Sequence, residues 1–284
     1  MLNYKILADS CMDPTPEQKA DPRIELIPLT LQVGDISIRD DETFDQKEFL
    51  RLVAESDEVA KSACPSPEAY MRAIAESDAD CVFIITLTQH LSGSYNAAIL
   101  GQNLYREEYE DSTKKIHVFS SDSASAGETV LVEKITELVA SGMDFDQIVS
   151  EIDRFRTKDL KTFFVLDDME ALRKNGRLTG LTAVLVTALN IRPIMVGVGG
   201  RIARFDQARG TKKALLKMAQ AIVSDLGDET KERDLVISHC NCPERAAGLR
   251  ETFESMAQFR SIQVVPTAGV SSLYACDGGI VVAC

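Results

Sequence analysis

The sequence has no tryptophan and only three histidines, His90, His117 and His239, so few side chains are available as a general base near neutral pH. It also lacks a surplus of positive charge, because 31 Lys and Arg residues stand against 44 Asp and Glu residues. The resulting net charge of −13 disfavours nucleic acid as a partner, since most of the surface would repel phosphates. No apolar run approaches the ~20 residues that a membrane-spanning helix needs. We therefore expect neither nucleic-acid binding nor a membrane span.

Phosphate-binding loops and targeting segments are missing as well. There is no G-x-x-x-x-G-K-[ST] segment and no G-x-G-x-x-G after a strand-like run, so nucleotide binding through the usual loops has no support. The first residues, "MLNYKILADS", enter a strand-like pattern without a basic region and a cleavage site, which predicts a cytoplasmic protein. The seven cysteines are an odd number scattered along the chain, which favours reduced thiols over a disulfide framework.

What remains is the composition of a globular α/β protein. With 284 residues, 45% of them apolar and 26% charged, the chain has room for one large domain or two ordinary ones. Short apolar runs alternate with helical patterns, which is typical of α/β folds. The runs that we expect to form strands are Lys5–Ala8, Ile24–Leu29, Cys81–Leu87, Ile116–Phe119, Thr162–Leu166, Pro193–Val198, Leu235–Ser238 and Ile280–Ala283.

The two halves of the chain differ in pattern. Two amphipathic helices, around residues 130–139 and 148–155, lie between the fourth and fifth of these strands. In the second half, Gly199-Gly200 joins two strand-like runs within Met195–Phe205, which predicts a hairpin, and a helix follows over residues 212–226. We therefore expect a parallel-sheet domain over residues 1–160 and a mixed-sheet α/β domain over residues 161–284.

One polar turn stands out in the segment "CVFIITLTQHLSGSYNAAIL" (Cys81–Leu100). The apolar run over Cys81–Leu87 reads as a strand buried in a parallel sheet, and the residues from Asn96 onward read as a helix. Ser92-Gly93-Ser94 therefore lies where a strand leads into a helix N-terminus, and free backbone N–H groups attract anions there. The competing interpretation is that Ser92 or Ser94 only caps the helix.

Further polar residues follow other predicted strands of the first half. Asp9-Ser10 follows the first strand and "SSDSASAGE" (Ser120–Glu128) follows the fourth, and strand carboxyl ends are where open parallel sheets bind ligands. In "KSACPSPEAY" (Lys61–Tyr70), Ser66 and Pro67 are typical of a helix start, with Ser62 just upstream. Asp9 and Asp122 are interpreted first as turn or capping residues. Hydroxyls and backbone N–H groups without a lysine suit a single carboxylate better than a triphosphate.

Catalytic and metal sites have weaker support. A hydrolase that uses Ser92 or Ser94 as its nucleophile is the alternative function, but the sequence has no G-x-S-x-G turn there and no base placed beside either serine in a recognisable motif. "HCNC" (His239–Cys242) offers metal-ligating side chains but has no second cluster at the spacing of zinc sites, so we expect no metal and no cofactor.

Two basic segments occur in the second half of this acidic chain. "LDDMEALRKNGRLTG" (Leu166–Gly180) carries Arg173, Lys174 and Arg177 around an Asn-Gly turn. "QARGTKKA" (Gln207–Ala214) carries Arg209, Lys212 and Lys213 around a glycine. Each of these charges alone is typical of a solvated surface, but the two groups together favour contact with a phosphate or with the acidic face of a partner.

Taken in order, these segments resemble the DegV family of bacterial fatty-acid-binding proteins. The resemblance rests on "LADS", "LSGSYNAA", "FSSDSASAGE", "LRKNGRL", "IRPIM" with the Gly-Gly hairpin, and "ARGTKKA", which span nearly the whole chain. It implies two α/β domains with one long-chain fatty acid between them. It also implies that the chain is a lipid-binding carrier subunit, and that a separate kinase subunit of the dihydroxyacetone-kinase type phosphorylates the bound carboxylate. A membrane span is not implied, although transient contact with a membrane surface would suit a lipid carrier.

The resemblance also assigns roles to individual residues. The family's carboxylate-binding S-G-[ST] turn falls on Ser92, Gly93 and Ser94, and the threonine of its T-S-Q-P-S stretch falls on Ser62. The family histidine of H-x-G-P-G is replaced by Tyr274, with Asp277 at the place of the proline, so we expect the Tyr274 hydroxyl to reach the head group. We further expect Arg173, Arg177 and Arg209 to face the mouth of the site and to serve the partner kinase. The acyl chain length is not predicted.

Overall fold

The structure is a computed structural model that describes residues 2–178 and 190–284. The end of the basic segment at Thr179-Gly180 therefore lies outside the described residues. The elements, in chain order, are β1 (Tyr4–Asp9), α1 (Pro16–Ala20), β2 (Ile24–Ile27), β3 (Thr30–Val33), β4 (Ile36–Arg39), α2 (Gln46–Glu55), β5 (Lys61–Ala63), α3 (Pro67–Glu76), β6 (Cys81–Thr86), α4 (Ser94–Glu108), β7 (Lys115–Ser120), α5 (Ala126–Ala140), α6 (Phe145–Lys158), β8 (Thr162–Val165), α7 (Glu170–Lys174), β9 (Ile191–Val198), β10 (Arg201–Arg209), α8 (Thr211–Leu226), η2 (Gly227–Glu232), β11 (Asp234–His239), α9 (Pro243–Met256), β12 (Ser261–Pro266), α10 (Gly269–Ala275) and β13 (Ile280–Ala283).

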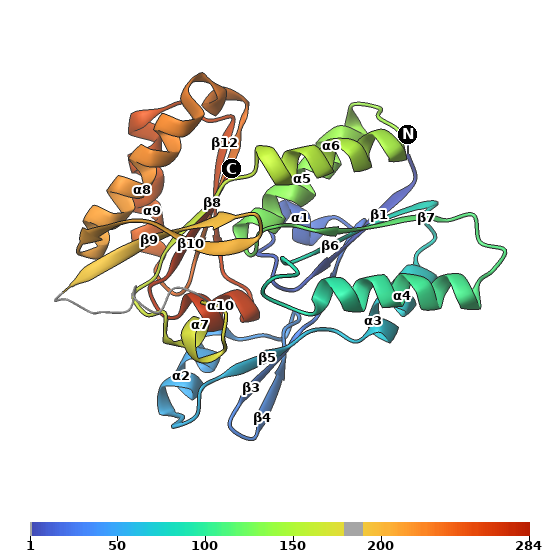
Figure 1. The fold of residues 1–284 in the computed structure, drawn as a ribbon, viewed down its shortest axis with the longest axis horizontal. Helices are drawn as coiled ribbons and strands as arrows, with labels where there is room; N and C mark the ends of the chain where they lie inside the picture. The colour runs from blue at the N-terminus through green and yellow to red at the C-terminus, as the bar shows by residue number, and fades with distance from the viewer. Residues whose placement is uncertain (1, 179–189) are drawn as a thin grey trace.

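The first half of the chain forms a four-stranded parallel sheet in the order β2-β1-β6-β7. Every residue of β6 is buried, because helices cover both faces of the sheet. In Figure 1, α3 and α4 lie on one face, and α5 and α6 lie on the other. The side chains alternate accordingly: Leu7 and Ile84 pack with α3 and α4, whereas Ile6 and Phe83 pack with α5 and α6.

The second half forms a six-stranded mixed sheet in the order β10-β9-β8-β13-β11-β12, in which only the β11–β12 pair is parallel. α8 and α9 pack on one face of this sheet, where Val165, Ile237 and Val282 meet their apolar sides. On the other face, Val236 and Val281 belong to the same core cluster as α5. α5 is therefore shared between the two sheets, and its apolar sequence reflects contact on both sides.

A small antiparallel sheet in the order β4-β3-β5 extends from the first half towards α10 (Figure 1). Its strands are short, and β4 is mostly exposed. Leu31 of β3 is fully buried and pairs with Ser62 of β5, while Val270 of α10 joins the same apolar cluster as Leu31. This sheet thereby places Ser62 beside a helix from the far end of the chain.

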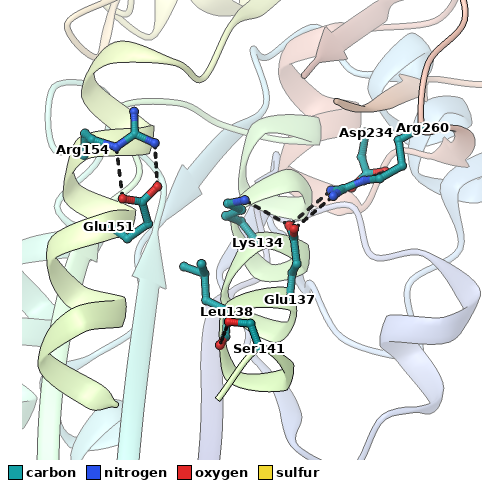
Figure 2. A network of polar contacts seen from close by, with 8 residues as sticks. All are labelled: Lys134, Glu137, Leu138, Ser141, Glu151, Arg154, Asp234 and Arg260. Atoms are coloured by element: carbon teal, nitrogen blue, oxygen red, sulfur yellow. Dashed lines mark hydrogen bonds and ion pairs between the residues drawn. The ribbon is translucent and has the colours of Figure 1, made fainter. Parts of the chain in front are cut away.

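An ion-pair network also links the two halves at α5 (Figure 2). Arg260, just before β12, contacts Glu137 of α5 with an N–O distance of 3.0 Å and also pairs with Asp234 at the start of β11. Arg154 and Glu151 pair within α6 at 2.5 Å and so connect no second element.

Most of the predicted architecture is confirmed. The first sheet is parallel, the second is mixed, and β9 and β10 form the predicted hairpin through Gly199-Gly200. Ser66 caps α3 by accepting a hydrogen bond from the Ala69 N–H at 3.3 Å, with Pro67 as the first helical residue. The domain boundary near residue 160 stays a prediction. Among the described helices, we find none with the length and apolar character required to cross a bilayer.

Candidate functional site

A pocket lies between the loops that follow β1, β6 and β7 and the face of the second sheet that carries Val281. Phe164 of β8 and Val281 of β13 are direct partners in the sheet and form part of its floor. The lining residues are Cys11, Leu29, Ser62, Leu87, Thr88, Leu91, Ser92, Asp122, Ser123, Ala124, Ser125, Thr162, Phe164, Leu166, Leu172, Arg177, Gly197, Gly200, Arg201, Ile202, Val270, Ser271, Tyr274, Ala275 and Val281. The wall is mainly apolar, with hydroxyl groups gathered in the loops.

The Ser-Gly-Ser turn joins β6 to α4, as the sequence predicts, and its two serines face different environments. Ser92 lines the pocket, and its Oγ accepts a hydrogen bond from the Ser94 N–H at 3.2 Å. Ser94 is fully buried, donates its hydroxyl proton to Asp9 at 2.6 Å and lies 2.7 Å from the Tyr70 hydroxyl. Gly93 precedes α4 and is exposed. Ser92 therefore lines the pocket, whereas Ser94 is buried beside it and bonds to Asp9.

Asp9 anchors this turn from the end of β1. Its Oδ1 accepts from the Cys11 N–H at 3.1 Å, which is the turn contact expected of an aspartate. Its Oδ2 accepts from the Leu87 N–H at 3.0 Å and from Ser94. Burial raises the pKa of Asp9 to about 6, while these hydrogen bonds act in the opposite direction. Asp9 therefore fixes both sides of the loop that carries Ser92.

Ser62 and Tyr274 meet at the same end of the pocket, although they are 212 positions apart in the sequence. The Ser62 Oγ and the Tyr274 hydroxyl oxygen are 2.9 Å apart, and both residues line the pocket. Tyr274 belongs to α10, whose first N–H groups are held by Asp40: Gly269 and Val270 donate to its carboxylate at 2.7 and 2.8 Å. Burial raises the pKa of Asp40 to about 6.

Arg177 also lies at this end. Its guanidinium carbon is 5.5 Å from the centre of the Tyr274 ring, a cation–π arrangement. Its Nε donates to the Leu91 carbonyl at 3.3 Å, next to Ser92. A cationic group, two serines and a phenol therefore converge at one end of an apolar pocket, which is suited to a ligand with one anionic head and an apolar body.

The other two arginines expected at the mouth lie outside the pocket lining. Arg173 is exposed on α7 and forms a two-point ion pair with Glu170, at 2.7 and 2.5 Å. Arg209 is exposed at the end of β10, opposite Ile191. Their predicted contact with a kinase stays a prediction.

The β9–β10 hairpin closes the pocket against the loop after β6. The Thr88 Oγ1 donates to the Gly200 carbonyl at 2.9 Å. Gly200 has φ +72°, and a Cβ atom there would lie 2.4 Å from Thr88 Oγ1 and 3.2 Å from Asp122 Oδ1. Only glycine permits this close approach.

No histidine is among the described residues that line the pocket. His117 and His239 do not line it, and His90 is exposed, with its backbone N–H directed to Thr88 Oγ1 at 3.3 Å. Ser94 bonds to Asp9 and Tyr70 and not to an imidazole. The geometry of the described residues therefore gives no support to a serine nucleophile with a histidine base.

Sequence reasoning missed buried carboxyl groups around the site, among them Asp40 and Glu128. Asp40 anchors α10, and Glu128 lies in the first turn of α5, where it groups with Asp9 and Cys11. One ligand atom from each of Asp9, Cys11 and Glu128 lies within 4.8 Å of the other two. No local motif signals either contact, because each partner comes from a distant part of the chain. In the sequence, Glu128 stands out only as the last residue of the polar segment "SSDSASAGE".

Comparison with known proteins shows the family. A family model described as an uncharacterised protein of the DegV family matches residues 3–283. A DegV domain-containing protein of Streptococcus pneumoniae is 36% identical over 289 residues, which is 98% of each chain. A DegV family structure from Ruminococcus gnavus, refined with vaccenic acid, is 43% identical with a TM-score of 0.95 over 100% of both chains. The fatty acid kinase (Fak) B3 protein of Streptococcus pneumoniae, loaded with linoleic acid, is 34% identical with a TM-score of 0.85 over 100% of this chain and 99% of that one.

Both the fold and the sequence matches extend over essentially the whole chain, and they agree with the order of motifs along it. We conclude that the chain belongs to the DegV family.

Proposed function

We propose that this protein binds one long-chain fatty acid, with the acyl chain in the apolar pocket and the carboxylate at Ser62, Ser92 and Tyr274. The observation that carries the proposal is the convergence of these three hydroxyls, together with Arg177, at one end of a pocket whose remaining wall is mainly apolar. Burying a long acyl chain stabilises the complex by roughly 25 cal/mol per Å² of apolar surface.

The family neighbours support this choice of ligand. The Ruminococcus gnavus structure contains vaccenic acid, and the Fak B3 protein is loaded with linoleic acid. In this chain, Ser94 contributes by holding the turn through Asp9, and Gly93 supplies the start of α4. No protein base is required for such binding, and no catalytic residue is assigned.

We further propose that the bound carboxylate is presented to a separate kinase subunit, which forms the acyl phosphate. The fatty acid kinase name of the Streptococcus pneumoniae neighbour supports this role. Arg173 and Arg209 are exposed on an otherwise acidic protein, where a guanidinium can bind a phosphoryl oxygen or a partner carboxylate at two points. Arg177, which lines the pocket, is expected to contact the head group and the transferred phosphoryl group.

Organic extraction followed by mass spectrometry tests the ligand. Protein purified from cells should contain a fatty acid above the level of a control protein, and added palmitate should raise the Tm of delipidated protein. The double variant Ser62→Ala, Ser92→Ala should bind palmitate more weakly by about 0.5–1.5 kcal/mol for each hydroxyl, or up to ~3 if the carboxylate is charged. Ser255→Ala, on an exposed turn of α9, is the matched control. Unchanged affinity in the double variant would show that the carboxylate binds elsewhere.

Kinase assays test the second part. Arg173→Ala and Arg209→Ala should leave palmitate affinity intact and slow acyl-phosphate formation by a cognate kinase, with a loss that depends on salt. Arg106→Ala, exposed near the end of α4, is the control. A normal phosphorylation rate in both variants, or a joint loss of stability and fatty acid, would contradict the docking role.

A further inference from the structure

Glu128 is an unusual residue for a protein interior. It is fully buried in the first turn of α5, and neither of its carboxyl oxygens accepts a hydrogen bond from a described residue. One of these oxygens lies within 4.8 Å of both a carboxylate oxygen of Asp9 and the sulfur of Cys11. A buried carboxylate without strong donors is costly, so burial disfavours the ionised form of Glu128.

The surroundings make ionisation still less favourable. The titratable groups that face Glu128 come from the loop after β1, from β1 itself and from α3: they are Asp9, Cys11, Asp13 and Tyr70. All of these become anionic or stay neutral, and within residues 2–178 and 190–284 no Lys, Arg or His forms a hydrogen bond or ion pair with Asp9, Asp13 or Glu128. Burial, followed by the charge of Asp9, raises the pKa of Glu128 well above its ordinary value.

The two carboxyl groups are not equivalent, and their hydrogen bonds show which one carries the charge. Asp9 accepts bonds from the N–H groups of Cys11 and Leu87 and from the hydroxyl of Ser94, whereas Glu128 accepts none. Donors aimed at a carboxyl group favour its ionised form. The pair therefore holds one proton, which belongs on Glu128, and the nearby oxygen of Asp9 is its acceptor.

We propose that Glu128 is kept as a neutral carboxylic acid that donates its proton to the Asp9 carboxylate, and that this shared proton positions the turn at residues 92–94. Asp9 is the only side chain seen to bond both to the end of β6, through Leu87, and to the start of α4, through Ser94, among the described contacts. A second negative charge beside it would push Asp9 away from these donors. Glu128 is thus a positioning residue for the head-group loop. This role rests on the proposed function, because it matters to the ligand only if the carboxylate binds at Ser92.

The sign of the pH dependence follows from the state of Glu128. Above about pH 4.5 the unfolded chain loses the proton of Glu128, while the folded protein keeps it, so the stability of the wild-type protein falls as pH rises. Glutamine has the same shape, donates an N–H to Asp9 and does not titrate. The Tm of Glu128→Gln relative to wild type should therefore increase between pH 5 and pH 8, by at least ~3 °C.

Three measurements test the proposal together. The infrared difference spectrum of wild-type protein minus Glu128→Gln at pH 7 should contain the C=O band of a neutral carboxylic acid. Glu128→Gln should keep the palmitate affinity of wild type, whereas Glu128→Leu, which has no donor, should bind about tenfold more weakly, as for one lost hydrogen bond to a charged group. Glu108→Gln, exposed on α4, is the control and should match wild type throughout.

Several results would overturn the proposal. One is the absence of the infrared band. Another is a Tm difference between Glu128→Gln and wild type that does not change with pH. A third is one equivalent of bound metal in wild-type protein that is missing from Glu128→Gln, because Asp9, Cys11 and Glu128 would then form a cation site. If wild-type protein binds no fatty acid at all, the proposed function fails, while the infrared and Tm comparisons still decide where the proton lies.

Discussion

The two halves of the chain contribute different chemistry to one pocket. The first half supplies most of the hydroxyls, from loops after parallel strands, such as Ser92 and Ser123. The second half supplies most of the large apolar side chains, such as Phe164 and Ile202, and both arginines of the lining, Arg177 and Arg201. Strand ends of a parallel sheet leave polar backbone groups free to bind a head group, whereas the face of the mixed sheet offers a continuous apolar floor. The fatty acid of the proposed function would need both surfaces, so neither half is expected to bind one alone.

The two halves contact each other at Gly200, and we expect a substitution there to have the largest effect on stability and on palmitate binding. Gly200→Ala would place a methyl group 2.4 Å from Thr88 Oγ1 at a positive φ, so the hairpin has to move away from the loop after β6. We expect a loss of about 2–3 kcal/mol in the free energy of unfolding, together with weaker palmitate binding. Gly199→Ala is the matched control, because it shares a positive φ but meets no atom within 4 Å. Equal losses in the two variants would mean that the close approach contributes nothing.

Buried aspartates of the first half anchor elements of both halves, which makes stability depend on pH. Asp40, from the loop after β4, holds the N-terminus of α10, and its pKa is raised to about 6, as is that of Asp9. A raised pKa means that the folded state binds protons more tightly than the unfolded chain, so stability increases as pH falls from about 7 to about 4. We expect the Tm to be several degrees higher at pH 5 than at pH 7.5.

Asp40→Asn separates this pH effect from the anchoring effect. The variant should lower the Tm at all pH values, because one oxygen that accepts backbone N–H bonds is lost, and it should also reduce the pH slope. A wild-type Tm that falls steadily between pH 7.5 and pH 5 would contradict the raised pKa values of Asp9 and Asp40.

The sequence alone predicted the parallel and mixed sheets, because strands such as β6 are apolar on both faces and therefore easily recognised. It did not predict β3, β4 and β5, because these strands have only three or four residues each, too few to give a clear pattern, and β4 is also mostly exposed. It also missed β12, an edge strand whose side chains are mostly half-exposed. Edge strands and short ribbons are defined by their partners, which a single sequence does not show.

The residues of the site also differ in whether the sequence indicated them. Ser92 and Ser62 could be selected because hydroxyls next to a strand end or a helix start have a recognisable local pattern. The pairing of Ser62 with Tyr274 came only from the resemblance to a family. The contacts of Asp40 with α10, of Glu128 with Asp9 and of Arg177 with Tyr274 join distant segments, and no local pattern indicates them.

The Ser62–Tyr274 contact joins the two halves at the head-group end, where we expect a moderate effect. Tyr274→Phe removes the phenol oxygen that lies 2.9 Å from Ser62 Oγ but keeps the ring on which Arg177 packs. Palmitate binding should weaken by about 0.5–1.5 kcal/mol, with little change in Tm. The loss should be the same at pH 6 and pH 8. If Tyr274→Phe binds palmitate with the affinity of wild type, Tyr274 does not belong to the head-group site.

The smallest effect is expected where the halves meet far from the pocket, in the network of Figure 2. Arg260 connects Glu137 of α5 with Asp234 of β11, but its side chain is 41% exposed, so solvent screens the ion pairs. Arg260→Ala should lower the free energy of unfolding by no more than about 1 kcal/mol, and less at high salt. Arg154→Ala is the control, since its partners Glu151 and Asp159 are near it in the chain and join no second sheet. Urea unfolding of both variants at low and high salt gives the comparison. If Arg260→Ala lowers the free energy of unfolding by no more than Arg154→Ala does, the two halves are held together by the shared apolar packing of α5 and not by this network.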